Sequence, residues 1–153
     1  MVFWQVVLIF FLCASICAYE KKRNLFFARE ASEMIQAKDK KEYLRKTYSF
    51  LTQRFAAEHL CWLKYPLRTF WLGDVWNKRS IPCNVQNSLF QHCLQKRFNK
   101  KEIKTKWIII PKQAIIHCYS LICVRGKWIP VDVWGAHHGI PFGEDMVSAG
   151  YKR

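Results

Sequence analysis

The sequence predicts an α+β fold, in which helices come first and an antiparallel sheet follows. Apolar residues recur every three or four positions over residues 41–63 and 83–98, which is the period of a helix with one buried face. Beyond residue 103, β-branched and aromatic residues instead form short runs separated by turn signals. Strands that follow helices, rather than alternate with them, are typical of α+β domains.

Length and composition indicate one folded domain. Of the 153 residues, 51% are hydrophobic and 16% aromatic, which is enough apolar material for a core. The net charge of +14 suits an anionic partner such as nucleic acid or a membrane surface. The basic residues are spread along the chain without a nucleic-acid-binding motif. We therefore favour a solvated basic surface and consider a nucleic-acid partner disfavoured.

An uncharged apolar run extends from Val2 to Tyr19. It is at the short limit for a membrane-spanning helix, and a signal peptide cleaved after Ala18 is the alternative. No basic segment precedes the run, which weakens the signal-peptide interpretation. Lys21 to Arg23 follow it, and a basic flank tends to stay on the cytoplasmic side. We therefore favour an uncleaved anchor over a cleaved, secreted form, with a buried soluble helix as the third alternative.

These features divide the chain into three parts. Residues 1–19 form a hydrophobic anchor or signal segment, residues 20–39 a helical or loosely ordered connector, and residues 40–153 the folded domain. The prediction is a membrane-associated protein with a single domain.

The first helix of the domain is predicted over residues 41–63. Leu44, Leu51 and Phe55 belong to a single apolar face, with basic residues available for the other faces. Pro66 lies just beyond the helix, where a residue without an amide hydrogen ends such a run.

A second helix is predicted from Cys83 to about residue 98. Val85, Leu89 and Cys93 form one apolar stripe, so this helix is expected to be buried. Pro82 suits the first turn, because its missing N–H would have no partner there in any case. Cys83 therefore lies in the first turn, where unpaired N–H groups supply partial positive charge. Such charge lowers the pKa of a thiol and favours the nucleophilic thiolate.

Strands are predicted over residues 104–110, 115–124 and 127–134. The middle strand is apolar almost throughout, so we expect it to be buried. Arg125-Gly126 is a turn signal between the last two strands.

This hairpin brings two polar residues together. If Arg125-Gly126 are its two loop residues, Val124 lies opposite Lys127. His117 and Asp132 are then diagonal neighbours on the same face of the sheet. A three-residue loop would place them on opposite faces instead.

The thiol, the imidazole and the carboxylate together form a candidate triad. A helix that packs on this sheet can bring Cys83 to the face that carries His117 and Asp132, and each group has a role in thiol catalysis. Taken singly, each residue also has a structural explanation: a core histidine, a carboxylate bonded to a neighbouring amide, and a small apolar filler.

The other cysteines suggest no disulfide framework. Seven cysteines occur, an odd number, and no Cys-x-x-Cys spacing is present; they lie at Cys13, Cys17, Cys61, Cys83, Cys93, Cys118 and Cys123. Most fall at apolar positions, where cysteine behaves as a small hydrophobic residue. We therefore predict mostly reduced thiols.

Two segments resemble a known superfamily. PCNVQNSLFQHCL (82–94) and IIHCYSLICVRGKWIPVDVWG (115–135) resemble the transglutaminase-like superfamily of papain-related thiol enzymes, above all its small bacterial members. The resemblance is strongest over 80–135, and it implies a papain/transglutaminase-like core. It also implies that Cys83, His117 and Asp132 are the catalytic triad, with Trp128 in the place expected before the aspartate.

The resemblance implies a transglutaminase-like acyltransferase or a cysteine peptidase that acts on protein or peptide amides through a thioester. The acceptor, amine or water, is left open, and no cofactor is implied. Gln86, Trp128 and Trp134 are candidate substrate-binding residues. The adjacent histidines His137-His138 match no zinc spacing, so no metal is expected. The alternative is an inactive fold that serves as a basic membrane-associated scaffold.

Overall fold

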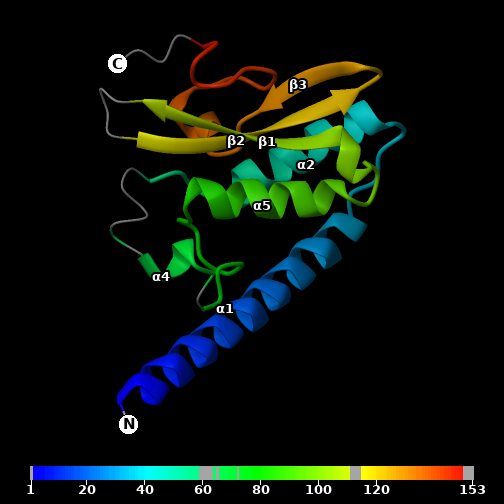
Figure 1. Ribbon diagram of the computed structural model, residues 1–153. Coiled ribbons are helices and arrows are strands. Elements are labelled where there is room, and N and C mark those ends of the chain that lie inside the picture. The colour runs from blue at the N-terminus through cyan, green and yellow to red at the C-terminus, as the bar shows by residue number, and fades with distance from the viewer. Residues whose placement is uncertain (1, 59–63, 65, 72, 111–114, 150–153) are drawn as a thin grey trace.

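The computed structural model describes residues 2–58, 64, 66–71, 73–110 and 115–149. Its helices are α1 (Val2–Glu33), α2 (Lys40–Arg54), the short α4 (Pro66–Thr69) and α5 (Cys83–Leu94). The strands that follow are β1 (Ile103–Ile110), β2 (Ile115–Val124) and β3 (Lys127–Val131). Short 3-10 helices lie at Lys100–Glu102 and Gly135–His138. Figure 1 shows helices packed beneath one antiparallel sheet, so the predicted α+β class is confirmed.

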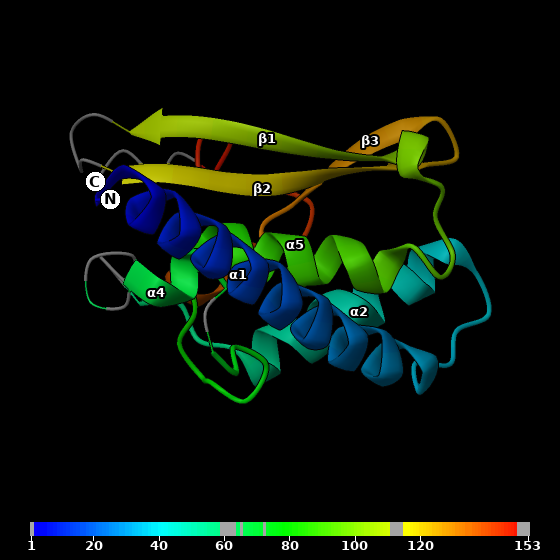
Figure 2. The same cartoon turned by 60° about the horizontal axis from the view of Figure 1, so that its bottom comes forward.

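Helix α5 is the centre of the fold. It contacts β2 on one side and both α1 and α2 on others, and Figure 2 shows α1 crossing in front of it. Leu89, Phe90 and Cys93 are fully buried, as are Tyr43 of α2 and Ile122 of β2. The predicted buried helix on an antiparallel sheet is confirmed, and its first residue is Cys83, as the sequence indicated.

The sheet has the strand order β1-β2-β3, and both pairings are antiparallel. Val124 pairs with Lys127, so Arg125 and Gly126 are the two loop residues, as predicted. Both have positive φ, 52° and 79°, which is the signature of the type I′ turn that suits a two-residue hairpin. This turn sets the register on which the candidate site depends.

Three predicted boundaries are wrong. Helix α5 ends at Leu94 rather than near residue 98, because the amides of Arg97 and Phe98 both donate to the Leu94 carbonyl in a turn that closes the helix. Helix α2 ends at Arg54, because Phe55 is extended and buried and Ala56 pairs with Ser80 in a parallel bridge. The rest of the predicted helix, residues 59–63 with Cys61, lies outside the described residues. Strand β3 ends at Val131 rather than at residue 134, because the chain turns there into the 3-10 helix Gly135–His138.

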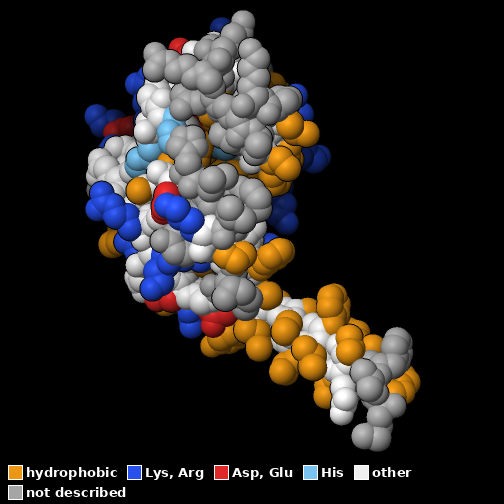
Figure 3. Space-filling model, turned by 90° about the vertical axis from the view of Figure 1, so that its left-hand side faces the viewer, with side chains coloured by type: hydrophobic (Ala, Val, Ile, Leu, Met, Phe, Trp, Pro, Cys, Tyr) orange, Lys and Arg blue, Asp and Glu red, His pale blue; other side chains and the backbone are white. Residues whose placement is uncertain are grey.

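Helix α1 continues through much of the predicted connector. Its second half packs into the core, with Asn24 and Ala28 fully buried. The Asn24 side chain accepts from the Trp76 amide at 2.7 Å and donates to the Gly73 carbonyl at 3.1 Å, which fastens α1 to the loop before α5. The first half projects from the body, and Figure 3 shows hydrophobic side chains covering it. Among the described residues, the segment Trp4–Glu33 is long and apolar enough to cross a membrane.

Candidate functional site

The start of α5 holds Cys83 firmly in place. Pro82 is the N-cap residue, with φ −61° and ψ 154°, and its carbonyl accepts from the amides of Val85 and Gln86. The Gln86 side chain then ties this turn down, because its Nε2 donates to Ile81 O and Ala56 O at 3.0 Å each. Both amide hydrogens of Gln86 are thus used inside the protein, and its side chain is buried. The structure gives Gln86 a supporting role and leaves it no donor for a substrate.

His117 and Asp132 form the buried polar contact that the hairpin register predicted. His117 Nε2 lies 2.7 Å from Asp132 Oδ2, and each side chain is only 1% exposed. The second carboxylate oxygen, Oδ1, accepts from the Gly135 amide at 2.7 Å. Both oxygens of Asp132 are therefore held in position, which fixes the imidazole in turn.

Gly135 is a site residue that the sequence reasoning missed. A Cβ at this position would lie 2.5 Å from both Cγ and Oδ2 of Asp132, closer than any side chain tolerates. The glycine therefore allows the chain to wrap around the carboxylate while its amide donates to it. The available signal was a glycine three residues after the aspartate, in DVWG.

The two predicted tryptophans have different positions. Trp134 is buried, and its ring centroid lies 5.1 Å from that of His117. Trp128 pairs with Cys123, six residues along β2 from His117, or about 20 Å away at the usual rise of a strand. It is 41% exposed and stacks under Lys104. The structure brings Trp134 to the site and leaves Trp128 outside it.

Cys83 lies beside this pair and is partly exposed. Its Sγ is 4.0 Å from the Ile116 carbonyl oxygen on β2. A small apolar cluster built from the C-terminal segment, with Trp134, Ile140 and Met146 at its centre, packs against it. The structure thus brings Cys83 near His117 and Asp132 at one end of α5. The prediction that α5 packs on the face that carries His117 and Asp132 is wrong, because α5 contacts Ser120, whose side chain lies on the opposite face of β2 from that of His117.

The electrostatics of the site favour a thiolate. A hydrogen bond from the Cys118 thiol, followed by a hydrogen bond and the charge of His117, lowers the pKa of Cys83 to about 5 against the opposing effect of burial. Burial lowers the pKa of His117, but the hydrogen bonds and charges of Asp132 and Cys83 outweigh it and raise that pKa to about 9. At neutral pH the two groups therefore form a thiolate–imidazolium pair.

The free nitrogen of His117 is the one available to the thiol. Nε2 bonds to Asp132, whereas Nδ1 is buried and, within the described part of the chain, makes no hydrogen bond of standard geometry. Hydrogen bonds between catalytic groups are often long before substrate binds. A thiolate, an imidazolium and an orienting carboxylate can perform nucleophilic attack on a carbonyl.

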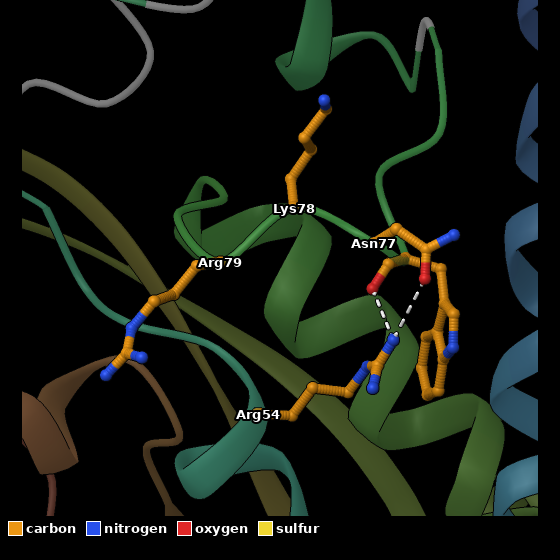
Figure 4. Close-up of a pocket in the computed structure, with 5 residues that line it drawn as sticks. Arg54, Asn77, Lys78 and Arg79 are labelled. Atoms are coloured by element: carbon orange, nitrogen blue, oxygen red, sulfur yellow. Dashed lines mark hydrogen bonds between the residues drawn. The ribbon is translucent and has the colours of Figure 1, made fainter.

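Other potential sites lie apart from the triad. A pocket of about 250 Å³ lies where α2 ends and the segment before α5 passes, and it is lined by Arg54, Trp76, Asn77, Lys78 and Arg79. Figure 4 shows Arg54 directed at Asn77 and the Trp76 carbonyl, while Lys78 and Arg79 point elsewhere, so the cations do not converge on one ligand. In the described ranges, no group of three or more acidic, His or Cys side chains forms a candidate metal site.

No family model, curated protein or solved structure matches this chain significantly.

Proposed function

We propose that this protein is a transglutaminase-like thiol enzyme that transfers acyl groups from protein or peptide amides. The observation that carries the proposal is the buried contact of His117 with Asp132 at 2.7 Å, beside a cysteine at the start of a buried helix. The pairing of a depressed thiol pKa with a raised imidazole pKa supports it, because perturbed pairs of this kind are common in active sites.

The first half of the reaction forms a thioester. The Cys83 thiolate attacks the amide carbonyl carbon, and the electron pair of the C=O bond moves to oxygen. The Cys83 backbone N–H, in the first turn of α5, is the candidate donor to this oxyanion. The His117 imidazolium then donates its proton to the leaving nitrogen, the C–N bond breaks, and an acyl-enzyme and a free amine result.

The second half releases the acyl group. Neutral His117 accepts a proton from an incoming amine or water, which attacks the thioester carbon and expels the Cys83 thiolate. An amine acceptor gives a cross-link, and water gives deamidation or cleavage. Throughout, Asp132 keeps the imidazole in the tautomer that presents Nδ1 to the thiol and stabilises the imidazolium.

The decisive experiment measures incorporation of a labelled primary amine into a glutamine-containing peptide, together with release of ammonia and peptide fragments. We expect activity in the wild type and none in Cys83→Ala. Cys123→Ala is the matched control, since this partly buried thiol lies on β2 away from the site, and it should retain wild-type activity. The product identifies the acceptor. A folded wild type that forms none of these products would refute the enzyme and favour the scaffold alternative.

We also propose that α1 attaches the domain to a membrane. The projecting half of α1 is apolar and exposed, with Phe10 70% and Leu12 61% accessible, and the basic residues Lys21 to Arg23 follow it. Such a helix lowers its free energy by entering lipid. The full chain should co-float with phospholipid vesicles, and the double variant Phe10→Lys, Leu12→Lys should not. Equal flotation of this variant and of the Phe10→Leu control would contradict attachment through α1.

A further inference from the structure

Cys118 is a buried thiol that the proposed reaction does not use, and the packing of α5 on β2 places it at the nucleophile. Ser120 Oγ donates to Asn87 Oδ1 at 2.5 Å, so Ser120 of β2 faces Asn87 of α5. Cys83 precedes Asn87 by one helical turn and lies on the same side of the helix. Cys118 precedes Ser120 by two residues and lies on the same face of the strand.

A contact at Ile116 fixes the direction in which α5 runs along β2. The Cys83 sulfur lies 4.0 Å from the Ile116 carbonyl, so α5 and β2 run in the same direction, with Cys83 near Ile116 and Asn87 at Ser120. Cys118 is midway between Ile116 and Ser120 on the strand. The two thiols therefore face each other across the interface between helix and sheet, in agreement with the influence of Cys118 that lowers the pKa of Cys83.

The two sulfurs differ in character. Cys83 is partly exposed, whereas Cys118 is only 2% exposed. The hydrogen bond to Cys83 and burial raise the pKa of Cys118 well above its usual range, so Cys118 remains a protonated donor. An accessible thiolate beside a buried thiol is the arrangement in which oxidation of the first sulfur is followed by attack of the second.

We propose that Cys83 and Cys118 form a dithiol that a hydroperoxide converts reversibly into a disulfide, which blocks the nucleophile. The proposal rests on the proposed function in one respect: it takes Cys83 to be the reactive thiol. A disulfide at this position removes the thiolate and protects Cys83 from irreversible oxidation.

The reaction balances in two steps. The Cys83 thiolate attacks a peroxide oxygen, the O–O bond breaks, and Cys83 becomes a sulfenic acid while the peroxide leaves as an alkoxide or hydroxide. The Cys118 sulfur then attacks the Cys83 sulfur, an S–S bond forms and the S–O bond breaks. The departing hydroxide takes the Cys118 proton and leaves as water. Two electrons pass from the two sulfurs to the peroxide.

The test is peptide mapping of the full chain after treatment with hydrogen peroxide and alkylation of the remaining thiols. We expect a peptide pair joined through Cys83 and Cys118, which dithiothreitol separates. In Cys118→Ser, which keeps a small hydrogen-bonding side chain, Cys83 should instead form a sulfenic acid trapped by dimedone and then a sulfinic acid that dithiothreitol does not reverse. Cys123→Ala should behave as the wild type.

The wild-type result is decisive by itself, whether or not the variant folds. Sulfinic acid at Cys83 without the joined pair, or a disulfide between Cys83 and another cysteine, would overturn the proposal. The experiment distinguishes the disulfide proposal from the proposed acyl transfer. Amine incorporation without the joined peptide pair refutes only the disulfide proposal. The joined pair in a protein that, once reduced, transfers no acyl group refutes only the proposed function.

Discussion

The two ends of α5 carry cysteines with opposite properties. Cys83 begins the helix, and its interactions with Cys118 and His117 lower its pKa to about 5. Cys93 lies near the other end, fully buried, and burial raises its pKa to about 12. The two residues are about 15 Å apart along one helix. The difference shows that the groups around a thiol, rather than its residue type or its helix, determine its ionisation.

The neighbours explain the contrast in detail. The Cys93 thiol donates to the Ala28 carbonyl of α1 at 3.3 Å, a bond that requires its proton and opposes the thiolate. The pKa of Cys83 is instead lowered by its interactions with the Cys118 thiol and with the charged His117 imidazole, which favour the thiolate. At one end the helix packs against another helix, and at the other it meets the sheet beside His117 and Asp132.

The largest effect is expected from Asp132→Asn, which changes the reactive end alone. Asp132 accepts from Gly135 through Oδ1 and contacts His117 Nε2 through Oδ2. An asparagine that keeps the Gly135 bond directs its NH₂ group at Nε2, so the ring proton must move to Nδ1, which then cannot accept a proton. We expect acyl transfer to fall by roughly 10³- to 10⁴-fold.

Steady-state rates of amine incorporation measure this effect. Asp74→Asn is the matched control, because Asp74 is a half-buried carboxylate that caps a turn away from the site, and its asparagine variant should keep the wild-type rate. An Asp132→Asn protein with near-normal activity would show that the carboxylate does not act through His117.

Alkylation by iodoacetamide at pH 7 should separate the two cysteines by at least about 10²-fold. Their pKa values of about 5 and about 12 imply a ratio of thiolate fractions of about 10⁵. A more acidic thiol is intrinsically less nucleophilic, which reduces the expected ratio of alkylation rates by about 10³. The burial of Cys93 then slows its alkylation further.

The pH dependence of the Cys83 alkylation rate tests whether the pKa of this thiol is lowered. Because the thiolate reacts, Cys83 alkylation should rise as pH increases through 5 and be nearly constant by pH 7. Mass spectrometry of timed samples gives the rate for each cysteine. A Cys83 rate that rises only near the usual thiol pKa would break the contrast between the two ends.

Gly135→Ala should give an intermediate effect, about tenfold on the Cys83 alkylation rate at pH 6. The added Cβ would overlap Asp132 Cγ and Oδ2 at 2.5 Å, so the carboxylate must move away from His117. The interaction with Asp132 that raises the pKa of His117 is then weaker, so a smaller fraction of His117 is imidazolium. With less imidazolium beside it, the Cys83 thiolate is less stable. Lys41→Ala, at an exposed position of α2 away from the site, is the control. Equal rates in the two variants would show that Asp132 tolerates displacement.

Much of the site could be predicted from local rules. The start of α5 follows from Pro82 and an apolar stripe, and the meeting of His117 with Asp132 follows from a two-residue turn and the alternation of a strand. Each inference involves residues whose relative positions are set by one helix or one hairpin. Relative positions within a single helix or hairpin can therefore be predicted from the sequence.

The rest depends on contacts between elements. Which residue of β2 faces Cys83 is decided by how α5 packs on the sheet, and no periodicity reveals that Cys118 does so. The end of α2 is likewise set by the bridge from Ala56 to Ser80, which overrides a helical pattern that continues past residue 55. Gly135 escaped notice because its close approach to Asp132 exists only in the folded chain.

The smallest effect is expected at the unreactive end, from Cys93→Ala. Cys93 is completely buried between α1 and α5, so removal of its sulfur leaves a small cavity and breaks the bond to Ala28. We expect the free energy of unfolding to fall by about 1–2 kcal/mol, measured by urea denaturation. The Cys83 alkylation rate should stay within about twofold of the wild type, because no group that lowers the Cys83 pKa is touched. If Cys93→Ala slowed Cys83 as much as Gly135→Ala does, the two ends of α5 would be coupled, and the chemistry of Cys83 would no longer be a property of its immediate neighbours.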